Sequence, residues 1–236
     1  MDTRVKEFIE KHIDLIDAGD FATLYKQSTP GTCLGEITRE LMSVGIDPLE
    51  NSDIVYPKMF DGCTRFGSFT VPEGIKMLGE GAFKDSLFSS VSLPESLVRI
   101  GVNCFRRAEI KKVVFSYNCN LEIVDEQAFY EAANLTNIIL PRRCKHVHIM
   151  AFASSGLQEV LLPDNVEWIG SGAFMHTPLK NIRIPRNISH VGTYVFSGCD
   201  NLQNIYVPED VIKKTAFWNS AKMEFLEGNN AEIVVV

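Results

Sequence analysis

Apolar and polar positions recur along this chain with a period of about 22 residues. One phenylalanine falls in each period, with successive spacings of 22, 24, 23, 22, 22 and 21 residues, at Phe83, Phe105, Phe129, Phe152, Phe174, Phe196 and Phe217. Prolines keep the same period at Pro72, Pro94, Pro141, Pro163, Pro185 and Pro208. In five of these six cases the proline precedes the next phenylalanine by 11 residues, so the chain contains an internal repeat.

The repeat unit has the form L-x-x-I-x-I-P-x-x-V-x-x-I-G-x-x-A-F, as residues 157–174 and 179–196 illustrate. In I-x-I-P, two apolar residues flank an outward position, which is the alternation of a strand, and the proline ends the strand because it lacks an N–H donor. The V-x-x-I-G segment returns apolar side chains to the same core, the glycine permits a tight turn, and A-F fills the far side of the core. We therefore predict one short strand in each repeat.

One repeat is too small to bury its own apolar side chains, but stacked repeats bury them against one another. We predict a repeat solenoid over residues 66–220, with about seven repeats, mainly β with short turns or helical segments, and with one parallel sheet. The repeat around Ser116 is the outlier, because serine replaces the proline there and two extra residues precede the phenylalanine.

This unit resembles the repeat of the BspA-like leucine-rich repeat proteins, whose signature is I-x-I-P followed by I-G-x-x-A-F. The resemblance implies a leucine-rich-repeat solenoid that works by binding, since members of this class occur as bacterial surface adhesins, protozoan surface proteins and phage-encoded proteins. The N-terminal layout of L-I-D-A-G-D-F, then G-I-D-P-L, then Y-P-K-M-F resembles the helical lead-in of some phage leucine-rich-repeat proteins. That second resemblance implies a phage-encoded protein.

We expect residues 1–50 to form a helical N-terminal cap, because a solenoid exposes apolar side chains at both ends. Apolar residues recur there at helical spacing, and the predicted helices cover residues 5–16, 21–25 and 34–42. Asp20 is placed to cap the second helix, and Gly45 is placed to end the third. Residues 51–65 are either a connector or a degenerate first repeat.

At the other end, residues 221–236 are predicted to form two capping strands around an E-G-N-N turn. An edge strand at this end also allows a homodimer, formed by pairing with a symmetry mate.

The charge of the chain favours a protein as the partner. The formal net charge is -7, and residues 1–60 carry 11 acidic and 6 basic side chains. Nucleic acid and anionic membrane surfaces both require a cationic face, so we expect neither as a partner. The sequence shows no apolar run of the roughly 20 residues that a membrane span needs and no signal-like apolar start. We therefore expect a cytoplasmic protein, in the host cytoplasm if it is phage-encoded.

Candidate chemistry is sparse. Cys144, His146 and His148 lie close together in the sequence, which suggests a metal site or a Cys-His nucleophile. The repeat register instead places Cys144 in the core, His146 at an outward position and His148 at the turn glycine. Cys104 and Cys199 also align with core positions, which predicts reduced thiols. No nucleotide-binding or hydrolase motif occurs, so we expect no catalytic residue, no metal, no cofactor and no enzymatic activity.

The middle residue of each I-x-I-P strand should point away from the core. In register these outward positions are Thr70, Ser92, Val114, Ile139, Leu161, Arg183 and Tyr206, so three successive repeats expose an aliphatic side chain. The candidate partner-binding residues on this face are Val114, Ile139, Leu161, Arg183, Tyr206, Lys112 and Glu159. Two alternatives remain: the aliphatic residues reflect strand propensity alone, or the N-terminal helices cover the face.

The basic pairs Arg106-Arg107, Lys111-Lys112 and Arg142-Arg143 are either contacts for an acidic partner or solvated turn charges. The leading hypothesis is a non-enzymatic intracellular protein-interaction module whose acidic helical cap offers a second contact surface. A specific form of it is a phage-encoded inhibitor of a host defence protein. The alternatives are a bacterial surface adhesin or structural protein without its export signal, and a hydrolase or metal enzyme.

Overall fold

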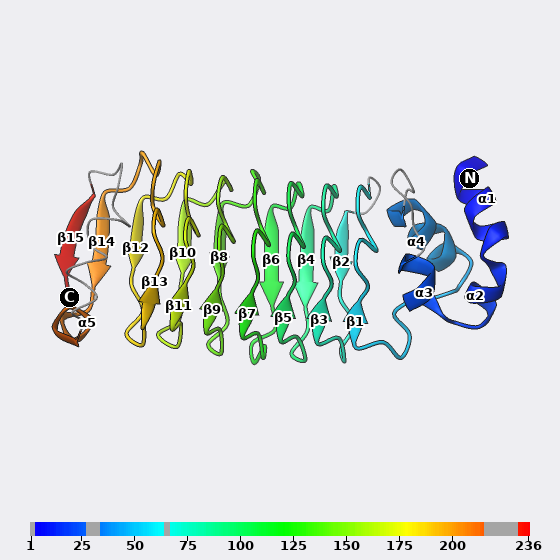
Figure 1. Ribbon diagram of the computed structural model, residues 1–236, viewed down its shortest axis with the longest axis horizontal. Coiled ribbons are helices and arrows are strands. Elements are labelled where there is room, and N and C mark those ends of the chain that lie inside the picture. The colour runs from blue at the N-terminus through cyan, green and yellow to red at the C-terminus, as the bar shows by residue number, and fades with distance from the viewer. Residues whose placement is uncertain (1–2, 27–33, 64–66, 215–230) are drawn as a thin grey trace.

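The chain forms an elongated solenoid of stacked repeats, and the part of the chain that the structure describes has four helices at its N-terminal end (Figure 1). This computed structural model describes residues 3–26, 34–63, 67–214 and 231–236. The repeats follow one another along the long axis, so the N-terminal helices and the C-terminal strand lie at opposite ends of the molecule. The predicted solenoid fold is confirmed.

Each full repeat contributes two short strands, where the sequence predicted one. The I-x-I-P strands pair in parallel and divide among three sheets, with the orders β2-β4-β6, β8-β10 and β12-β14-β15. Their bounds are β2 (Ser68–Thr70), β4 (Ser90–Leu93), β6 (Lys112–Phe115), β8 (Asn137–Ile139), β10 (Glu159–Leu161), β12 (Asn181–Arg183), β14 (Asn204–Val207) and β15 (Glu232–Val235).

The segment before the repeat glycine forms the second strand, and these strands make a continuous seven-stranded parallel sheet. They are β1 (Ile54–Val55), β3 (Met77–Leu78), β5 (Arg99–Ile100), β7 (Ile123–Val124), β9 (His146–Val147), β11 (Trp168–Ile169) and β13 (His190–Val191). The predicted single sheet is thus replaced by one long and three shorter sheets. The first break, between β6 and β8, falls at the outlier repeat, where the extra residues lengthen the connection.

The repeat glycine allows close packing between repeats, whereas the sequence suggested a tight turn. A Cβ atom at Gly101 would lie 2.5 Å from the carbonyl oxygen of Leu78, so no side chain fits between these repeats. The left-handed backbone conformation occurs two residues after the glycine, as at Asn103 (φ 54°) and Tyr194 (φ 56°). The glycine therefore allows neighbouring repeats to pack closely, and the residue two positions later has the left-handed conformation of the turn.

A stack of buried phenylalanine rings runs through the core. Neighbouring ring centroids lie between 5.0 and 6.0 Å apart, and neighbouring ring planes differ by at most 14°. The stacked rings are Phe60, Phe83, Phe105, Phe129, Phe152, Phe174 and Phe196. Backbone hydrogen bonds tie the repeats together beside the stack; the N–H of Phe152, for example, donates to the carbonyl oxygen of Ala173 at 2.8 Å. Phe217 lies outside the described residues.

The N-terminal helices follow the sequence prediction with one difference. They are α1 (Thr3–Lys11), α2 (Ile13–Asp17), α3 (Phe21–Lys26) and α4 (Leu34–Ser43). The predicted first helix is divided at His12, which has a non-helical backbone and whose Nδ1 lies 2.8 Å from the carbonyl oxygen of Phe8. The predicted caps are present: the N–H of Thr23 donates to Asp20 Oδ1 at 3.1 Å, and Gly45 has a φ of 86°.

The helices pack against the first repeat. The hydroxyls of Tyr25 and Thr38 are 2.6 Å apart, and Thr38 Oγ1 donates to the carbonyl oxygen of Met59 at 2.8 Å. The ring of Tyr25 also stacks on that of Tyr56, with centroids 5.6 Å apart. Residues between the helices and the first I-x-I-P strand share the repeat pattern, since β1 pairs with β3 and Phe60 joins the ring stack. The helices therefore close the end of the solenoid.

At the C-terminal end, a helix that the sequence did not suggest, α5 (Glu209–Lys214), follows Pro208. The predicted strand β15 is present and pairs in parallel with β14. Its predicted partner strand falls within residues 221–230, outside the described residues. Of the helices in the described part of the chain, none has the length and apolar character required to cross a membrane.

Candidate partner-binding face

The outward positions of the I-x-I-P strands line up in rows across the described repeats. We call the row of middle positions the outer row; its members are Thr70, Ser92, Val114, Ile139, Leu161, Arg183 and Tyr206. The ladders pair Ser92 with Val114, Ile139 with Leu161, and Arg183 with Tyr206. The register inferred from the sequence therefore holds within each of the three short sheets.

The aliphatic members of the outer row are exposed. Ile139 is 67% exposed, Leu161 57% and Val114 39%, whereas the adjacent Ile138 and Val113 are 2% and 9% exposed. Strand alternation explains this difference, because successive side chains point to opposite faces. The N-terminal helices lie beyond β1 at the end of the solenoid and do not cover the outer row (Figure 1). The alternative that the helices cover this face is therefore excluded.

Polar side chains flank the apolar part of the outer row. Lys112 and Glu159, both candidate contact residues, are exposed at the preceding outward position of their strands. At the same position of other strands, Asn204 Nδ2 donates to Asn181 Oδ1 at 2.8 Å. An apolar strip with a polar border is the arrangement found at protein interfaces.

Arg183 and Tyr206 are less accessible than the sequence suggested. Both are half-buried. Arg183 Nη1 donates to Asp164 Oδ1 at 2.7 Å, and this hydrogen bond lowers the pKa of the Asp164 carboxyl. Tyr206 lies beside Val234 of β15 in the ladder. A partner would therefore meet Arg183 as one half of an ion pair.

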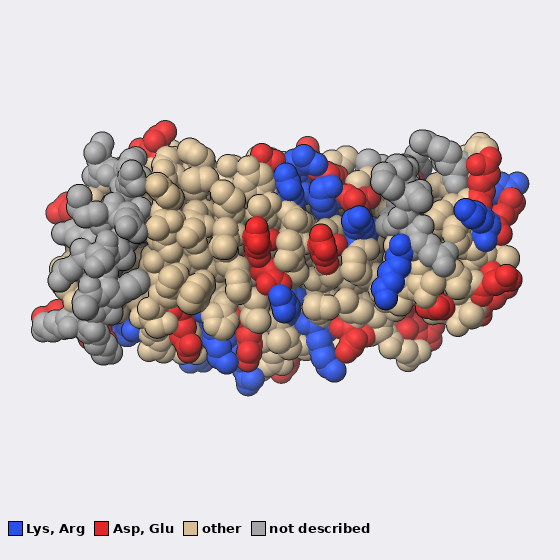
Figure 2. Space-filling model, viewed as in Figure 1, with Lys and Arg blue, Asp and Glu red and all other residues tan. Residues whose placement is uncertain are grey.

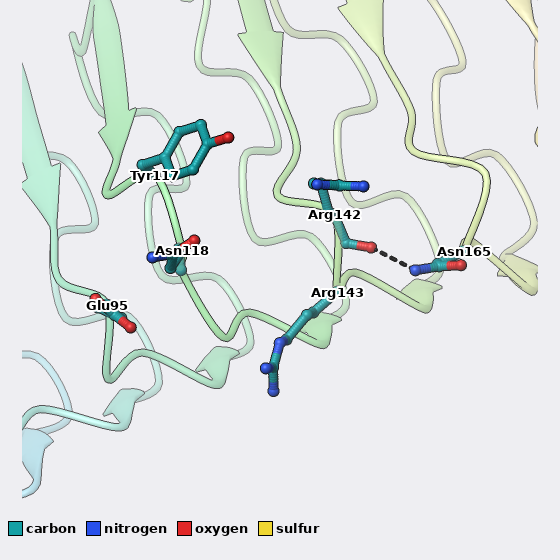
Figure 3. A pocket seen from close by; sticks show the side chains of 7 residues that line it. Glu95, Tyr117, Asn118, Arg142, Arg143 and Asn165 are labelled. Atoms are coloured by element: carbon teal, nitrogen blue, oxygen red, sulfur yellow. Dashed lines mark hydrogen bonds between the residues drawn. The ribbon is translucent and has the colours of Figure 1, made fainter.

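A hollow of about 500 Å³ lies directly beyond the apolar strip, where β6, β8 and β10 end (Figure 3). Its lining residues are Glu95, Tyr117, Asn118, Cys119, Arg142, Arg143 and Asn165. They come from consecutive repeats, and Asn165 Nδ2 donates to the carbonyl oxygen of Arg142 at 2.8 Å. The sequence reasoning missed this hollow, although the extra residues of the outlier repeat and the Arg142-Arg143 pair both lie at it.

Of the three basic pairs, Arg106-Arg107 contacts other side chains of the protein. Arg107 makes two hydrogen bonds to Asp85, with Nε to Oδ1 at 2.6 Å and Nη2 to Oδ2 at 2.8 Å, and these bonds lower the pKa of the Asp85 carboxyl. Arg106 lies over the ring of Tyr130, 5.2 Å from its centroid. On the face shown in Figure 2, charged side chains gather over the helices, over the first repeats and along the lower edge of the solenoid. Arg106 and Arg107 thus have contacts within the protein.

In the Cys144, His146 and His148 cluster, the thiol is separated from solvent. Cys144 is fully buried, and burial raises the pKa of its thiol to about 12. A thiol with so high a pKa is a poor nucleophile near neutral pH. The rings of His146 and His148 are 6.0 Å apart. Within the described ranges, no group of three or more His, Cys, Asp or Glu side chains is arranged to hold a metal ion.

The predicted core positions of the cysteines are confirmed by their burial. Cys63, Cys104, Cys119, Cys144 and Cys199 are all buried, and Cys33 lies outside the described residues. Cys199 packs in its predicted core slot, with its Sγ 3.3 Å from Thr177 Oγ1. These cysteines fill space in the core.

Stacked repeats with parallel strands, a ring ladder in the core and an exposed strand face define this protein as a leucine-rich-repeat scaffold. The family description "BspA type Leucine rich repeat region" matches six copies, over residues 43–121 and 122–233. The chain belongs to the BspA-type leucine-rich repeat family.

Solved bacterial structures share the fold at low sequence identity. The pneumococcal vaccine antigen PcpA is 20% identical with a TM-score of 0.55, over 63% of this chain and 44% of that one. A leucine-rich repeat protein from Bacteroides ovatus is 19% identical with a TM-score of 0.54, over 78% of this chain and 58% of that one. The T. pallidum protein TpLRR is 21% identical with a TM-score of 0.52, over 73% of this chain and 91% of that one.

These likenesses establish the fold alone. The match covers about half the length of the first two structures. No curated protein sequence matches the chain at a significant level.

Proposed function

We propose that this protein is a non-enzymatic protein-binding module and that the apolar part of the outer row is its contact surface. The observation that carries the proposal is the exposure of Val114, Ile139 and Leu161 on a strand face that none of the helices in the described ranges covers. Burying one exposed aliphatic side chain against a partner contributes roughly 1 to 3 kcal/mol. A rigid repeat scaffold adds affinity, because little conformational entropy is lost when it binds.

Charge supports a protein as the partner. The net charge of -7 opposes binding to nucleic acid or to an anionic membrane. The acidic helical cap is a second candidate contact surface. We place the protein in the cytoplasm, and the more specific form of the proposal is a phage-encoded inhibitor of a host defence protein. The N-terminal resemblance to phage leucine-rich-repeat proteins is its support.

A bacterial surface adhesin or structural protein is the alternative. Its support is the shared fold with a protein described as a pneumococcal vaccine antigen. The two proposals differ in where the partner resides: an intracellular partner supports the first, and an extracellular or cell-surface partner supports the second.

The test is affinity capture from a lysate of the native host, followed by mass spectrometry. The wild type is compared with an Ile139→Glu/Leu161→Glu variant, which places two charges in the apolar strip. A Val44→Glu/Leu87→Glu variant is the matched control, because these two exposed side chains lie outside the outer row and are 65% and 44% exposed. Circular dichroism checks that both variants are folded.

We expect one or more proteins to be captured by the wild type and the control and to be lost from the outer-row variant. Capture by all three proteins would move the contact surface away from the outer row. Loss from the control alone would place it near the helices. Capture of nothing by any of them would count against a binding module.

A further inference from the structure

The hollow and the apolar strip form one continuous surface. Val114, Ile139 and Leu161 occupy β6, β8 and β10, and the hollow begins where these strands end. Tyr117 and Arg142 each follow an aliphatic outer-row residue by three positions along the chain. Three residues of extended chain span about 10 Å. A bound segment can therefore reach the strip and the hollow together.

The hollow is cationic, although the protein as a whole is acidic. Its lining includes the guanidinium groups of Arg142 and Arg143 and the carboxylate of Glu95, which lies on the far side of the hollow from Arg142 (Figure 3). Both arginine side chains are exposed, and no ion pair joins either of them to a carboxylate within the described residues.

Carboxylates in the repeats before and after Arg142 and Arg143 already form ion pairs with other basic side chains. Glu122 pairs with Lys145 at 3.4 Å, and Asp164 pairs with Arg183 at 2.7 Å and with Arg186 at 3.9 Å. Arg142 and Arg143 therefore remain available to an acidic ligand. A guanidinium group binds a carboxylate through two parallel hydrogen bonds.

An aromatic side chain completes the site. Tyr117 is 92% exposed and stands on the turn after β6, where the outlier repeat carries serine in place of the repeat proline. It faces the hollow opposite Arg142 (Figure 3). Tyrosine and arginine are enriched among the residues that dominate binding energy at protein interfaces. The outlier repeat thus adds a tyrosine wall beside the arginine pair.

We propose that the hollow binds an Asp or Glu side chain of an extended acidic segment in a partner protein, while aliphatic side chains of that segment pack on Val114, Ile139 and Leu161. This inference rests on the function proposed above and adds the chemistry of the partner. It predicts a ligand with an acidic residue about three residues from an aliphatic one, because about 10 Å separates the strip from the hollow.

The test selects ligands for the full chain from a displayed library of random peptides. We expect the selected peptides to be enriched in Asp or Glu about three residues from Leu, Ile or Val. Synthetic copies with amidated C-termini should bind the Arg142→Gln/Arg143→Gln variant more weakly by roughly tenfold or more, the scale of lost charge-assisted hydrogen bonds. Binding should also weaken as NaCl rises.

A Lys6→Gln/Lys11→Gln variant is the control for loss of two positive charges, since both lysines are exposed on α1 at the helical end of the molecule. It should bind the peptides as the wild type does. Selected peptides without acidic enrichment, or with equal affinity for the arginine variant, would overturn the inference. Peptides that bind only with a free C-terminus would also overturn it, because the terminal carboxylate would then occupy the hollow in place of an Asp or Glu side chain. Selection of no peptide at all would overturn it as well.

The two proposals fail in different ways. Purely aliphatic peptides that require Ile139 but not the arginine pair would refute the acidic segment and leave the outer row as a binding surface. Acidic peptides that require the arginine pair and bind the Ile139→Glu/Leu161→Glu variant normally would contradict the outer row.

Discussion

Replacing Phe152 with alanine removes one ring from the middle of the phenylalanine stack. Phe152 is fully buried, and its ring centroid lies 5.1 Å from that of Phe129 and 5.5 Å from that of Phe174. A buried Phe→Ala change costs about 3 to 5 kcal/mol, because transfer free energy is lost and a cavity forms. Stacked pairs on both sides place the expected loss near the upper end of that range.

We expect the free energy of unfolding, measured by urea titration with circular dichroism, to fall by about 4 to 5 kcal/mol. For a chain of this size, each kcal/mol lowers the Tm by roughly 2 to 4 °C, so the Tm should fall by roughly 8 to 20 °C. Because each repeat contacts only its neighbours, the transition should also become less cooperative.

Two variants serve as controls. Phe152→Leu keeps most of the volume and should cost less than about 2 kcal/mol. Tyr117→Ala removes an aromatic side chain that is 92% exposed and should change stability by no more than about 0.5 kcal/mol. If Phe152→Ala lost less than about 1 kcal/mol, the ring stack would not be the packed core described above.

Three further outcomes are expected. Arg99→Met should lower the free energy of unfolding, measured by urea titration, by about 1 to 3 kcal/mol, because the carboxylate of Asp125 then loses its hydrogen-bond donor. That carboxylate is only 6% exposed and accepts from Arg99 at 2.9 Å. Asp125→Asn should cost less than Arg99→Met in the same assay. The pKa of the Asp85 carboxyl is lowered in the folded state by its hydrogen bonds to Arg107. Its contribution to stability is therefore present above about pH 4 and is lost as pH falls through the folded pKa. Asp85→Asn should accordingly reduce the difference between the unfolding free energies measured at about pH 6 and about pH 3. Burial raises the pKa of the Cys104 and Cys144 thiols, so iodoacetamide at about pH 8 should label them only after unfolding, as peptide mass mapping would record; labelling in the native state would contradict their burial.

The repeat register and the outward positions could be predicted because each rests on residue types at fixed spacing. Phenylalanine, proline and the strand alternation recur at the same spacing in about seven repeats, so the pattern does not depend on a chance match in any one of them. The exposure of Ile139 and Leu161 followed directly from this register.

The seven-stranded sheet could not be predicted from the same pattern. Its strands are two residues long, and two residues carry no alternation that separates a strand from a turn. The role of Gly101 was misassigned for a related reason: a glycine in a sequence signals missing side-chain volume or a left-handed backbone, and only the packing of neighbouring repeats decides between them.

The hollow depends on contacts between different repeats. Tyr117, Arg142 and Asn165 meet because their turns stack, and the extra residues of the outlier repeat offset one turn from the next. In the sequence, the irregular repeat and the arginine pair are two separate signals. Bringing them together required the three-dimensional register.

The most direct test of the proposed binding face is photo-crosslinking from position 139. A photoreactive phenylalanine analogue is placed at Ile139 in one protein and at Val44, an equally exposed position in the helical end, in another. After illumination in a native-host lysate, we expect a covalent adduct with a discrete partner from position 139 and none with that partner from position 44. Adducts from position 44 alone, or none from position 139, would contradict the assignment of the outer row as the contact surface.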